Sequence, residues 1–186
     1  MQAPGKKMET MRIFLNSWRL SLETFLPEDA FQSSDELRIF QATHFPWISD
    51  LPQPDLVFEL RRDLRSMLLS HDSAVAQSWL ATHPVAVMLE SDEDGLPFLR
   101  FTPLSCPCQL CGELLAIMVE AIELKDWYRL KICLDCQWIF YDTSKNASRL
   151  WCSMSGTEER GRACGNIAKA RRWRERHRQQ KGMGTA

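Results

Sequence analysis

All seven cysteines of this 186-residue chain lie in one stretch, between Cys106 and Cys164. A secreted disulfide framework usually has an even number of cysteines, whereas a clustered odd number favours the cytosol and a metal ion. The lysines near the N-terminus precede no apolar signal segment, and no uncharged apolar run approaches the roughly 18 residues of a membrane helix. We therefore expect a cytoplasmic, metal-binding protein without a membrane span.

Charge divides the chain into two parts. Residues 1–123 hold 9 Lys and Arg against 18 Asp and Glu, whereas residues 124–186 hold 14 against 6. An acidic body joined to a basic end indicates two functions on one chain, with a polyanion as the partner of the basic end. A solvated, charged tail is the simpler interpretation of the same pattern.

The N-terminal part of the chain has the apolar spacing of helices and belongs to the α+β class. We expect residues 1–10 to be disordered. Ser33 and Glu36 have the spacing of a capping box, and Arg61, Arg62 and Arg65 are assigned to the solvent side of a helix. The pattern predicts helices over residues 11–26, 33–44, 56–68, 74–81 and from 114 to about 125, and a β-hairpin formed by residues 85–89 and 96–101.

Four of the cysteines have the arrangement of a zinc site. Cys133 and Cys136 form a C-x-x-C knuckle between two β-like runs, and Cys152 and Cys164 form a second pair across eleven residues that must loop out. Four thiolates are the ligands of tetrahedral Zn²⁺ in a closed structural site. A module of about 50 residues also has too little apolar surface to fold without such support. Buried thiols without a metal, and a redox pair formed by Cys133 and Cys136, are the alternatives.

A family resemblance rests on the motifs around these cysteines. The sequence reads Trp-Ile-Phe-Tyr-Asp-Thr-Ser-Lys-Asn at 138–146, Trp-Cys-Ser-Met at 151–154 and Cys-Gly-Asn at 164–166. Residues 127–178 thereby resemble the CGNR zinc-finger family, whose members are bacterial transcription regulators with an N-terminal α/β domain called ABATE. In this chain Ile167 stands where the family has arginine, and the last two cysteines are further apart than the family's usual four intervening residues.

The resemblance implies a domain organisation and a zinc cofactor. It divides the chain into an ABATE-like α/β domain over residues 11–125, a CGNR-type zinc finger with a basic helix over 126–178 and a flexible tail over 179–186. The finger is expected to be a treble-clef-like or zinc-ribbon-like hairpin followed by the helix, with Asn166 as its N-cap. Zinc would be structural, with Cys133, Cys136, Cys152 and Cys164 as its ligands.

The basic C-terminal segment is the candidate nucleic-acid interface. Residues 169–181 hold seven Lys and Arg and one Glu, so a helix there is charged all round and cannot be buried. Such a surface favours phosphates, and duplex DNA is the partner that we expect. An RNA-binding or protein-binding zinc adaptor is the alternative, and a homodimer and a small-molecule effector remain open. The candidate contact residues are Lys145, Arg149, Lys169, Arg171, Arg172, Arg174, Arg176 and Arg178.

Cys106, Cys108 and Cys111 form a separate thiol group with three interpretations. They could belong to a loop at the start of a helix, to a second zinc cluster or to a redox sensor with a lowered thiol pKa. No glycine-rich phosphate loop or Ser/His/Asp arrangement is present in the sequence. We therefore predict no catalytic residues and no enzymatic activity, with a thiol oxidoreductase as the remaining enzymatic alternative.

Overall fold

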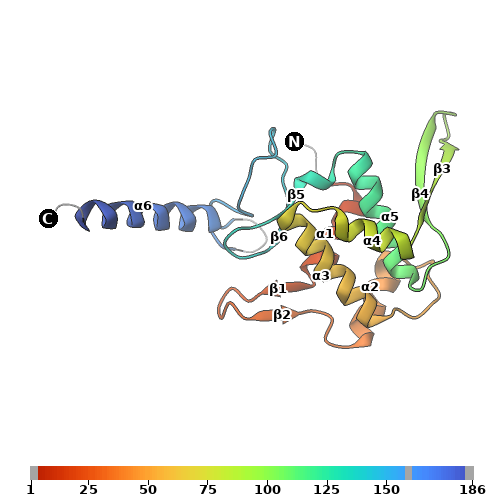
Figure 1. Cartoon of the computed structure of the whole chain (residues 1–186), viewed down its shortest axis with the longest axis horizontal. Helices are drawn as coiled ribbons and strands as arrows, with labels where there is room; N and C mark the ends of the chain where they lie inside the picture. The colour runs from red at the N-terminus through yellow and green to blue at the C-terminus, as the bar shows by residue number, and fades with distance from the viewer. Residues whose placement is uncertain (1–3, 158–160, 183–186) are drawn as a thin grey trace.

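The computed structural model describes residues 4–157 and 161–182, with side chains described as far as residue 178. Helices gather into one body, from which a β-hairpin and the C-terminal helix project in different directions (Figure 1). The described elements, in chain order, are α1 (Lys6–Asn16), β1 (Trp18–Leu20), β2 (Pro27–Asp29), α2 (Ser34–His44), α3 (Pro54–Ser70), α4 (Ala74–Thr82), β3 (Val85–Ser91), β4 (Pro97–Pro103), α5 (Gln109–Glu123), the 3₁₀ helix η1 (Trp127–Arg129), β5 (Leu130–Ile132), β6 (Ile139–Tyr141) and α6 (Cys164–Gly182).

The strands of the described residues form three separate two-stranded antiparallel sheets, β1–β2, β3–β4 and β5–β6. The chain is thus a mixed fold of helices and small sheets. The predicted helices over 33–44, 56–68, 74–81 and 114–125 and the hairpin over 85–101 are confirmed as α2, α3, α4, α5 and β3–β4. None of the described helices is long and apolar enough to cross a membrane.

The main core lies between α1, α3 and α5 and extends into the β5–β6 hairpin. Phe14, Leu64 and Leu114 are fully buried there, and Ile139 of β6 belongs to the same apolar cluster. The buried Asn16 side chain pairs with the Ile139 backbone in both directions, donating to its carbonyl and accepting from its N–H at 2.8 Å each. The hairpin that follows α5 is therefore anchored in the core of the helical body.

The first predicted helix is wrong at both ends. α1 begins at Lys6, so residues 6–10, which we expected to be disordered, form its first turns and bury Met8 and Thr10; residues 1–3 lie outside the described part. α1 then ends at Asn16, and residues 18–29 form the β1–β2 hairpin in place of the predicted helix over 11–26. The reason is tertiary, because Leu22, whose spacing continued the helical stripe, packs against a second apolar cluster around the cysteines.

Two arginines of α3 are buried, which corrects their predicted place on the solvent side. Arg61 and Arg65 are 4% and 7% exposed, whereas Arg62 is exposed. The Arg61 guanidinium donates to Asp29 at 2.8 Å, and that of Arg65 donates to the carbonyl of Leu15 at 2.7 Å. The apolar periodicity assigns every arginine to the solvent side. It does not reveal distant carboxylates and carbonyls that can accept the hydrogen bonds of a buried guanidinium.

Candidate metal centre

The first pair of cysteines lies in the turn between β5 and β6. The Cys133 N–H donates to the carbonyl of Trp138 at 2.9 Å, and the Gln137 N–H donates to the carbonyl of Cys133 at 2.9 Å. Gln137 has a left-handed backbone with φ of 58°, which reverses the chain directly after Cys136. This tight turn brings both thiols of the C-x-x-C motif to the same place.

The second pair comes from a loop and from the start of a helix. Cys152 lies in the loop after β6, and Cys164 is the first residue of α6. Two backbone hydrogen bonds hold these segments against the knuckle and against each other: Leu134 N–H to Leu150 carbonyl at 3.2 Å, and Gly165 N–H to Ser153 carbonyl at 2.9 Å. The segment expected to loop out lies between the two cysteines, and its residues 158–160 lie outside the described part.

The four sulfurs converge on one point. All four Sγ atoms lie within 4.8 Å of one another, and all four cysteines are buried. The Sγ atom of Cys152 lies 3.7 Å from those of both Cys136 and Cys164. Four thiolates at about 2.3 Å from a tetrahedral Zn²⁺ ion place neighbouring sulfurs about 3.8 Å apart. The donor set and its spacing therefore fit a structural zinc site in which the protein fills every position.

The four thiols shift one another's pKa values in opposite directions. Hydrogen bonds from the Cys136 and Cys152 thiols hold the pKa of Cys133 far below its ordinary value. The same bonds, together with burial and the charge of Cys133, raise the pKa of Cys136 and of Cys152. Burial raises the pKa of Cys164. A bound cation would favour the thiolate form of all four cysteines, because metal ligands must be deprotonated.

Two buried carboxylates that the sequence analysis missed support the centre. Asp135, within the knuckle, accepts from the Arg162 guanidinium at 2.8 Å and lies 3.5 Å from that of Arg171. These partners are 27 and 36 residues away along the chain, so no local pattern indicates them.

Asp142, the second buried carboxylate, follows β6, and a local sequence pattern indicates one of its contacts. It accepts from the N–H of Ser144 at 2.9 Å and of Arg149 at 2.8 Å, and from the Lys131 ammonium at 3.2 Å. Burial opposes its ionisation, but these donors outweigh it and lower the pKa of Asp142 to about 2. The bond to Ser144, two residues on, is an Asx turn, which the Asp-Thr-Ser sequence could have predicted.

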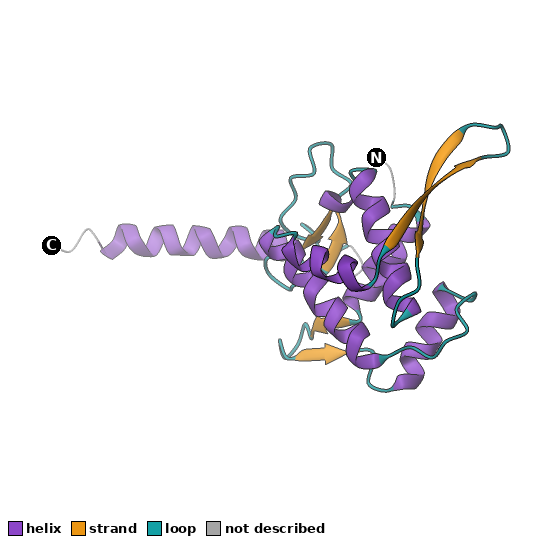
Figure 2. Ribbon diagram, turned by 45° about the vertical axis from the view of Figure 1, so that its right-hand side comes forward, coloured by secondary structure: helices purple, strands orange, loops and turns teal. Residues whose placement is uncertain are grey.

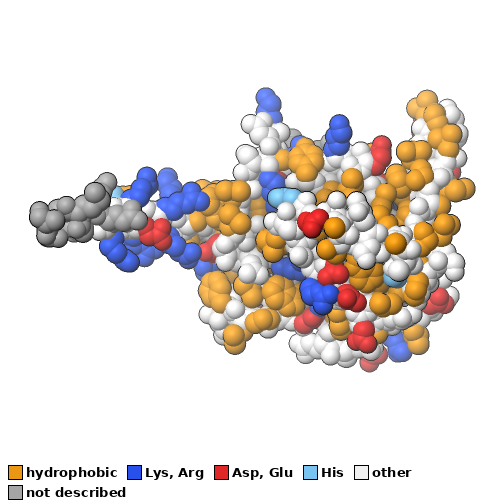
Figure 3. Space-filling model, in the orientation of Figure 1, with side chains coloured by type: hydrophobic (Ala, Val, Ile, Leu, Met, Phe, Trp, Pro, Cys, Tyr) orange, Lys and Arg blue, Asp and Glu red, His pale blue; other side chains and the backbone are white. Residues whose placement is uncertain are grey.

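The predicted nucleic-acid contacts lie in two different environments. Arg149 is half-buried. Its guanidinium donates to the carbonyl of Cys152 and lies 5.4 Å from the centre of the Phe140 ring, so it stabilises the loop that contains Cys152. Lys145 is exposed on the loop after β6. The remaining six are exposed on α6, where they form a band of positive charge (Figure 3): Lys169, Arg171, Arg172, Arg174, Arg176 and Arg178.

The start and end of α6 differ from the prediction. Asn166 was expected to cap the helix, but α6 begins at Cys164, so Asn166 lies within its first turn. Ile167, at the position of the family's arginine, is half-buried. α6 also continues through residues 179–182, which we had assigned to a flexible tail, while residues 183–186 of that tail lie outside the described part.

The remaining three cysteines occupy the loop at the start of α5. The N–H of Cys111 donates to the Cys108 sulfur, which caps the helix at 3.5 Å, and the Cys106 thiol donates to the Cys108 carbonyl at 3.3 Å. A hydrogen bond from the Cys111 thiol lowers the pKa of Cys108 to about 6, against the effect of burial. Among the described residues, only Cys133, Cys136, Cys152 and Cys164 bring three or more ligand-type side chains together, so a second zinc cluster is not supported.

Comparison with known proteins identifies the segment that carries the centre. Residues 129–177 match the family model described as CGNR zinc finger. The match contains all four converging cysteines and most of α6, and it confirms the resemblance predicted for residues 127–178. The part of the chain before residue 129 lies outside the match. No curated protein matches the chain.

Proposed function

We propose that this protein binds duplex DNA through α6 and regulates transcription, with zinc fixing the base of that helix. The observation that carries the proposal is the position of α6. The helix begins at the metal-site residue Cys164 and leaves the body as a solitary rod (Figure 2). Six exposed Lys and Arg follow within its next fourteen residues, with Glu175 as the one acidic residue among them.

The shape and charge of α6 suit a polyanion. At 1.5 Å per residue, its 19 residues span about 28 Å, which is about four fifths of one turn of the DNA duplex. Lysine and arginine release counterions when they bind phosphates, and arginine can also bind guanine edges. Beyond its first turn α6 carries basic side chains on all sides, which leaves this part of the helix exposed and available to a partner.

The rest of the molecule supports the same proposal. A hairpin that carries the first two proposed ligands, followed by a helix that begins at the fourth, supports a treble-clef-like finger. We propose that the acidic α/β body is ABATE-like and serves dimerisation or effector binding in the cytoplasm. Because β5 and β6 share its apolar core, a change in the body can reach the zinc centre through direct packing.

The test measures binding of the zinc-loaded full chain to a fluorescent random-sequence duplex over a salt series. A helix that makes about five phosphate contacts predicts a log–log slope of about −4 to −5. Replacing Arg172, Arg174, Arg176 and Arg178 together by alanine should abolish binding while zinc content stays unchanged. Tighter binding to single-stranded RNA than to duplex would favour the RNA adaptor. No binding to any nucleic acid in low salt would contradict the proposal and leave a protein partner.

A further inference from the structure

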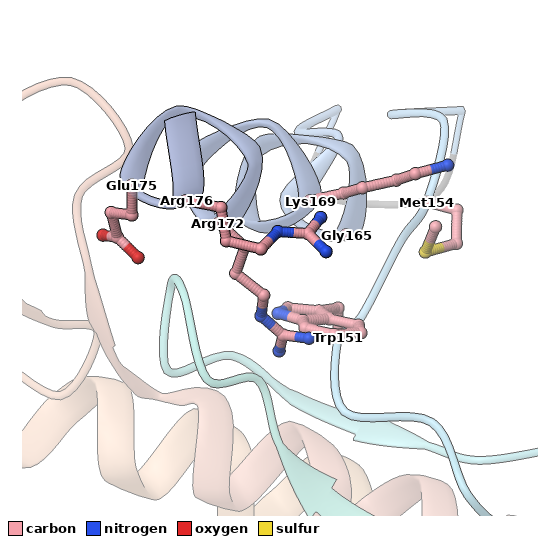
Figure 4. Close-up of a pocket in the computed structure, with 7 residues that line it drawn as sticks. All are labelled: Trp151, Met154, Gly165, Lys169, Arg172, Glu175 and Arg176. Carbon is pink, nitrogen blue, oxygen red and sulfur yellow. The ribbon is translucent and has the colours of Figure 1, made fainter. Parts of the chain in front are cut away.

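A cleft lies between α6 and the loop that carries Cys152. It has a volume of about 580 Å³. Trp151 and Met154 form its loop side, and Gly165, Lys169, Arg172, Glu175 and Arg176 form its helix side (Figure 4). The cleft thus combines an aromatic and an aliphatic surface with three positive charges and one negative charge.

The arginines of α6 divide into two faces by their helical spacing. Lys169, Arg172 and Arg176 follow one another at intervals of three and four residues, so they share the face that lines the cleft. Arg171, Arg174 and Arg178 have the same intervals, but they lie on the opposite face and do not line the cleft.

The contacts of the two faces differ as well. The Arg172 guanidinium lies 5.1 Å from the centre of the Trp151 ring, a cation–π distance that orients the arginine over the loop. On the other face, Arg171 is partly neutralised by Asp135 at 3.5 Å. The Arg174 Nε atom donates back to the Ala170 carbonyl at 3.3 Å. Each face thus combines three basic residues with one carboxylate, Glu175 on the cleft face and Asp135 on the other. What distinguishes the cleft face is the apolar wall of Trp151 and Met154 beside its charges.

We propose that this cleft binds one phosphodiester group of the DNA backbone, an inference that rests on the proposed function. Lys169, Arg172 and Arg176 surround the phosphate, and the adjoining sugar packs against Trp151 and Met154. Arginine suits this role because its planar donors match phosphate oxygens. The apolar wall suits the sugar, which carries no charge. The proposal makes one face of α6 the binding face, rather than the helix as a whole.

Both walls of the cleft are attached to the metal centre. Trp151 directly precedes Cys152, and Gly165 directly follows Cys164. The absence of a side chain at Gly165 lets Met154 lie against the helix, since an added Cβ atom would be 2.0 Å from the Met154 sulfur. The distance between the walls is therefore set by the same residues that hold zinc, and a phosphate site of this shape requires the metal.

The experiment compares two double variants that are matched in charge and spacing. Arg172→Ala with Arg176→Ala removes two arginines from the cleft face, and Arg174→Ala with Arg178→Ala removes two from the opposite face. We expect the cleft variant to lose about 30-fold in affinity for a 20-base-pair duplex, with a salt slope shallower by about 1 for the lost phosphate contact. The control variant should lose less than about fivefold from weaker long-range attraction.

The two ways of failing are distinguishable. Equal losses in the two variants, with zinc content equal to that of the unmodified chain, would overturn the cleft while leaving α6 as the DNA-binding element. Failure of the unmodified chain to bind duplex would overturn the proposed function and the cleft together. A greater loss in the control variant would place the phosphate on the opposite face.

Discussion

The two C-x-x-C motifs of this chain lie in opposite kinds of local structure. Cys108 and Cys111 span the start of a helix, where the Cys108 sulfur accepts a hydrogen bond from the backbone N–H of Cys111. Cys133 and Cys136 span the turn of a hairpin, where the thiols meet sulfurs from two other segments. Identical spacing therefore produces a helix cap in one place and a candidate metal centre in the other. What distinguishes them is the arrival of further ligands from distant parts of the chain.

The largest effect is expected from a substitution that removes one sulfur from the candidate metal centre and leaves Cys106, Cys108 and Cys111 unchanged. Cys136→Ser should lose bound zinc and lower the free energy of unfolding by more than about 4 kcal/mol, since metal binding contributes directly to folding. Cys106→Ser, the control, should keep zinc because Cys106 lies outside the cluster of four sulfurs. Metal analysis and urea unfolding of both variants test this. Zinc retained by Cys136→Ser at the level of the unmodified chain would refute the ligand assignment.

The second prediction concerns the support that the body gives to the knuckle. The Arg65 guanidinium donates at 2.9 Å to the carbonyl of Gln137, the residue after Cys136. Burial lowers the pKa of Arg65 to about 10, so it is charged at neutral pH. Arg65→Met should cost about 3 kcal/mol of stability because it leaves buried carbonyls without a donor, and should weaken zinc binding.

The control for this prediction is on the same helix. Arg62 is exposed and pairs with Glu59 at 3.2 Å, so Arg62→Met should change stability by less than about 0.5 kcal/mol. Chelator competition measures zinc affinity in both variants. Unchanged zinc affinity in Arg65→Met, at clearly lowered stability, would show that the knuckle forms independently of the body.

The third prediction uses pH to probe the helix-cap thiols. The pKa of Cys108 is about 6 in the folded chain, below the ordinary thiol value of about 8.5. Between these values the unfolded chain binds the proton and the folded chain does not, so this group adds stability as pH rises from about 6 to 8.5 and loses it as pH falls.

Cys108→Ser keeps an N-cap acceptor that does not titrate in this range. It should match the unmodified chain near pH 6 and be less stable by about 2 kcal/mol near pH 8.5. Urea unfolding at the two pH values, with zinc present, measures the difference and cancels the pH dependence of the metal centre. A constant difference between the two proteins would show that Cys108 is a neutral thiol.

The smallest expected effects compare the two Cys-Gly pairs. At Gly112, after Cys111, an added Cβ atom would be 2.8 Å from Cβ of Pro103 and 2.9 Å from the Cys106 sulfur. Gly112→Ala should therefore cost about 1 kcal/mol, since overpacking outweighs the gain in helix propensity. Gly165→Ala meets only the flexible Met154 side chain, so stability should change little. Thermal unfolding of both variants measures the two losses of stability. A greater loss in Gly165→Ala than in Gly112→Ala would contradict this prediction.

Local signals predicted some elements well. Ser33 and Glu36 are three residues apart, and the structure contains both hydrogen bonds of their capping box at the start of α2. The hairpin around Cys133 and Cys136 was also predicted, because β-forming residues flank the motif on both sides. In these cases the deciding interactions lie within a few residues of one another.

Other elements could not be predicted because their partners are distant. The β1–β2 hairpin is held by Arg61 from α3, through Ser17 at 2.6 Å and Asp29. No sequence pattern near Ser17 predicts its contact with an arginine 44 residues away. Asp135 is a similar case within the candidate site. The convergence of the four cysteines could be predicted because cysteine is rare and its chemistry narrow. The residues that position them are of common types, and their role depends on the fold.

Metal analysis of the full chain, combined with cobalt substitution, tests the central claim most directly. We predict one zinc ion per chain, and a cobalt-substituted protein whose absorption spectrum shows the strong sulfur-to-metal bands of a tetrahedral site with four thiolates. Zinc-free protein that is fully folded, two ions per chain, or a cobalt spectrum of oxygen ligation would contradict the convergence of Cys133, Cys136, Cys152 and Cys164 on a single ion.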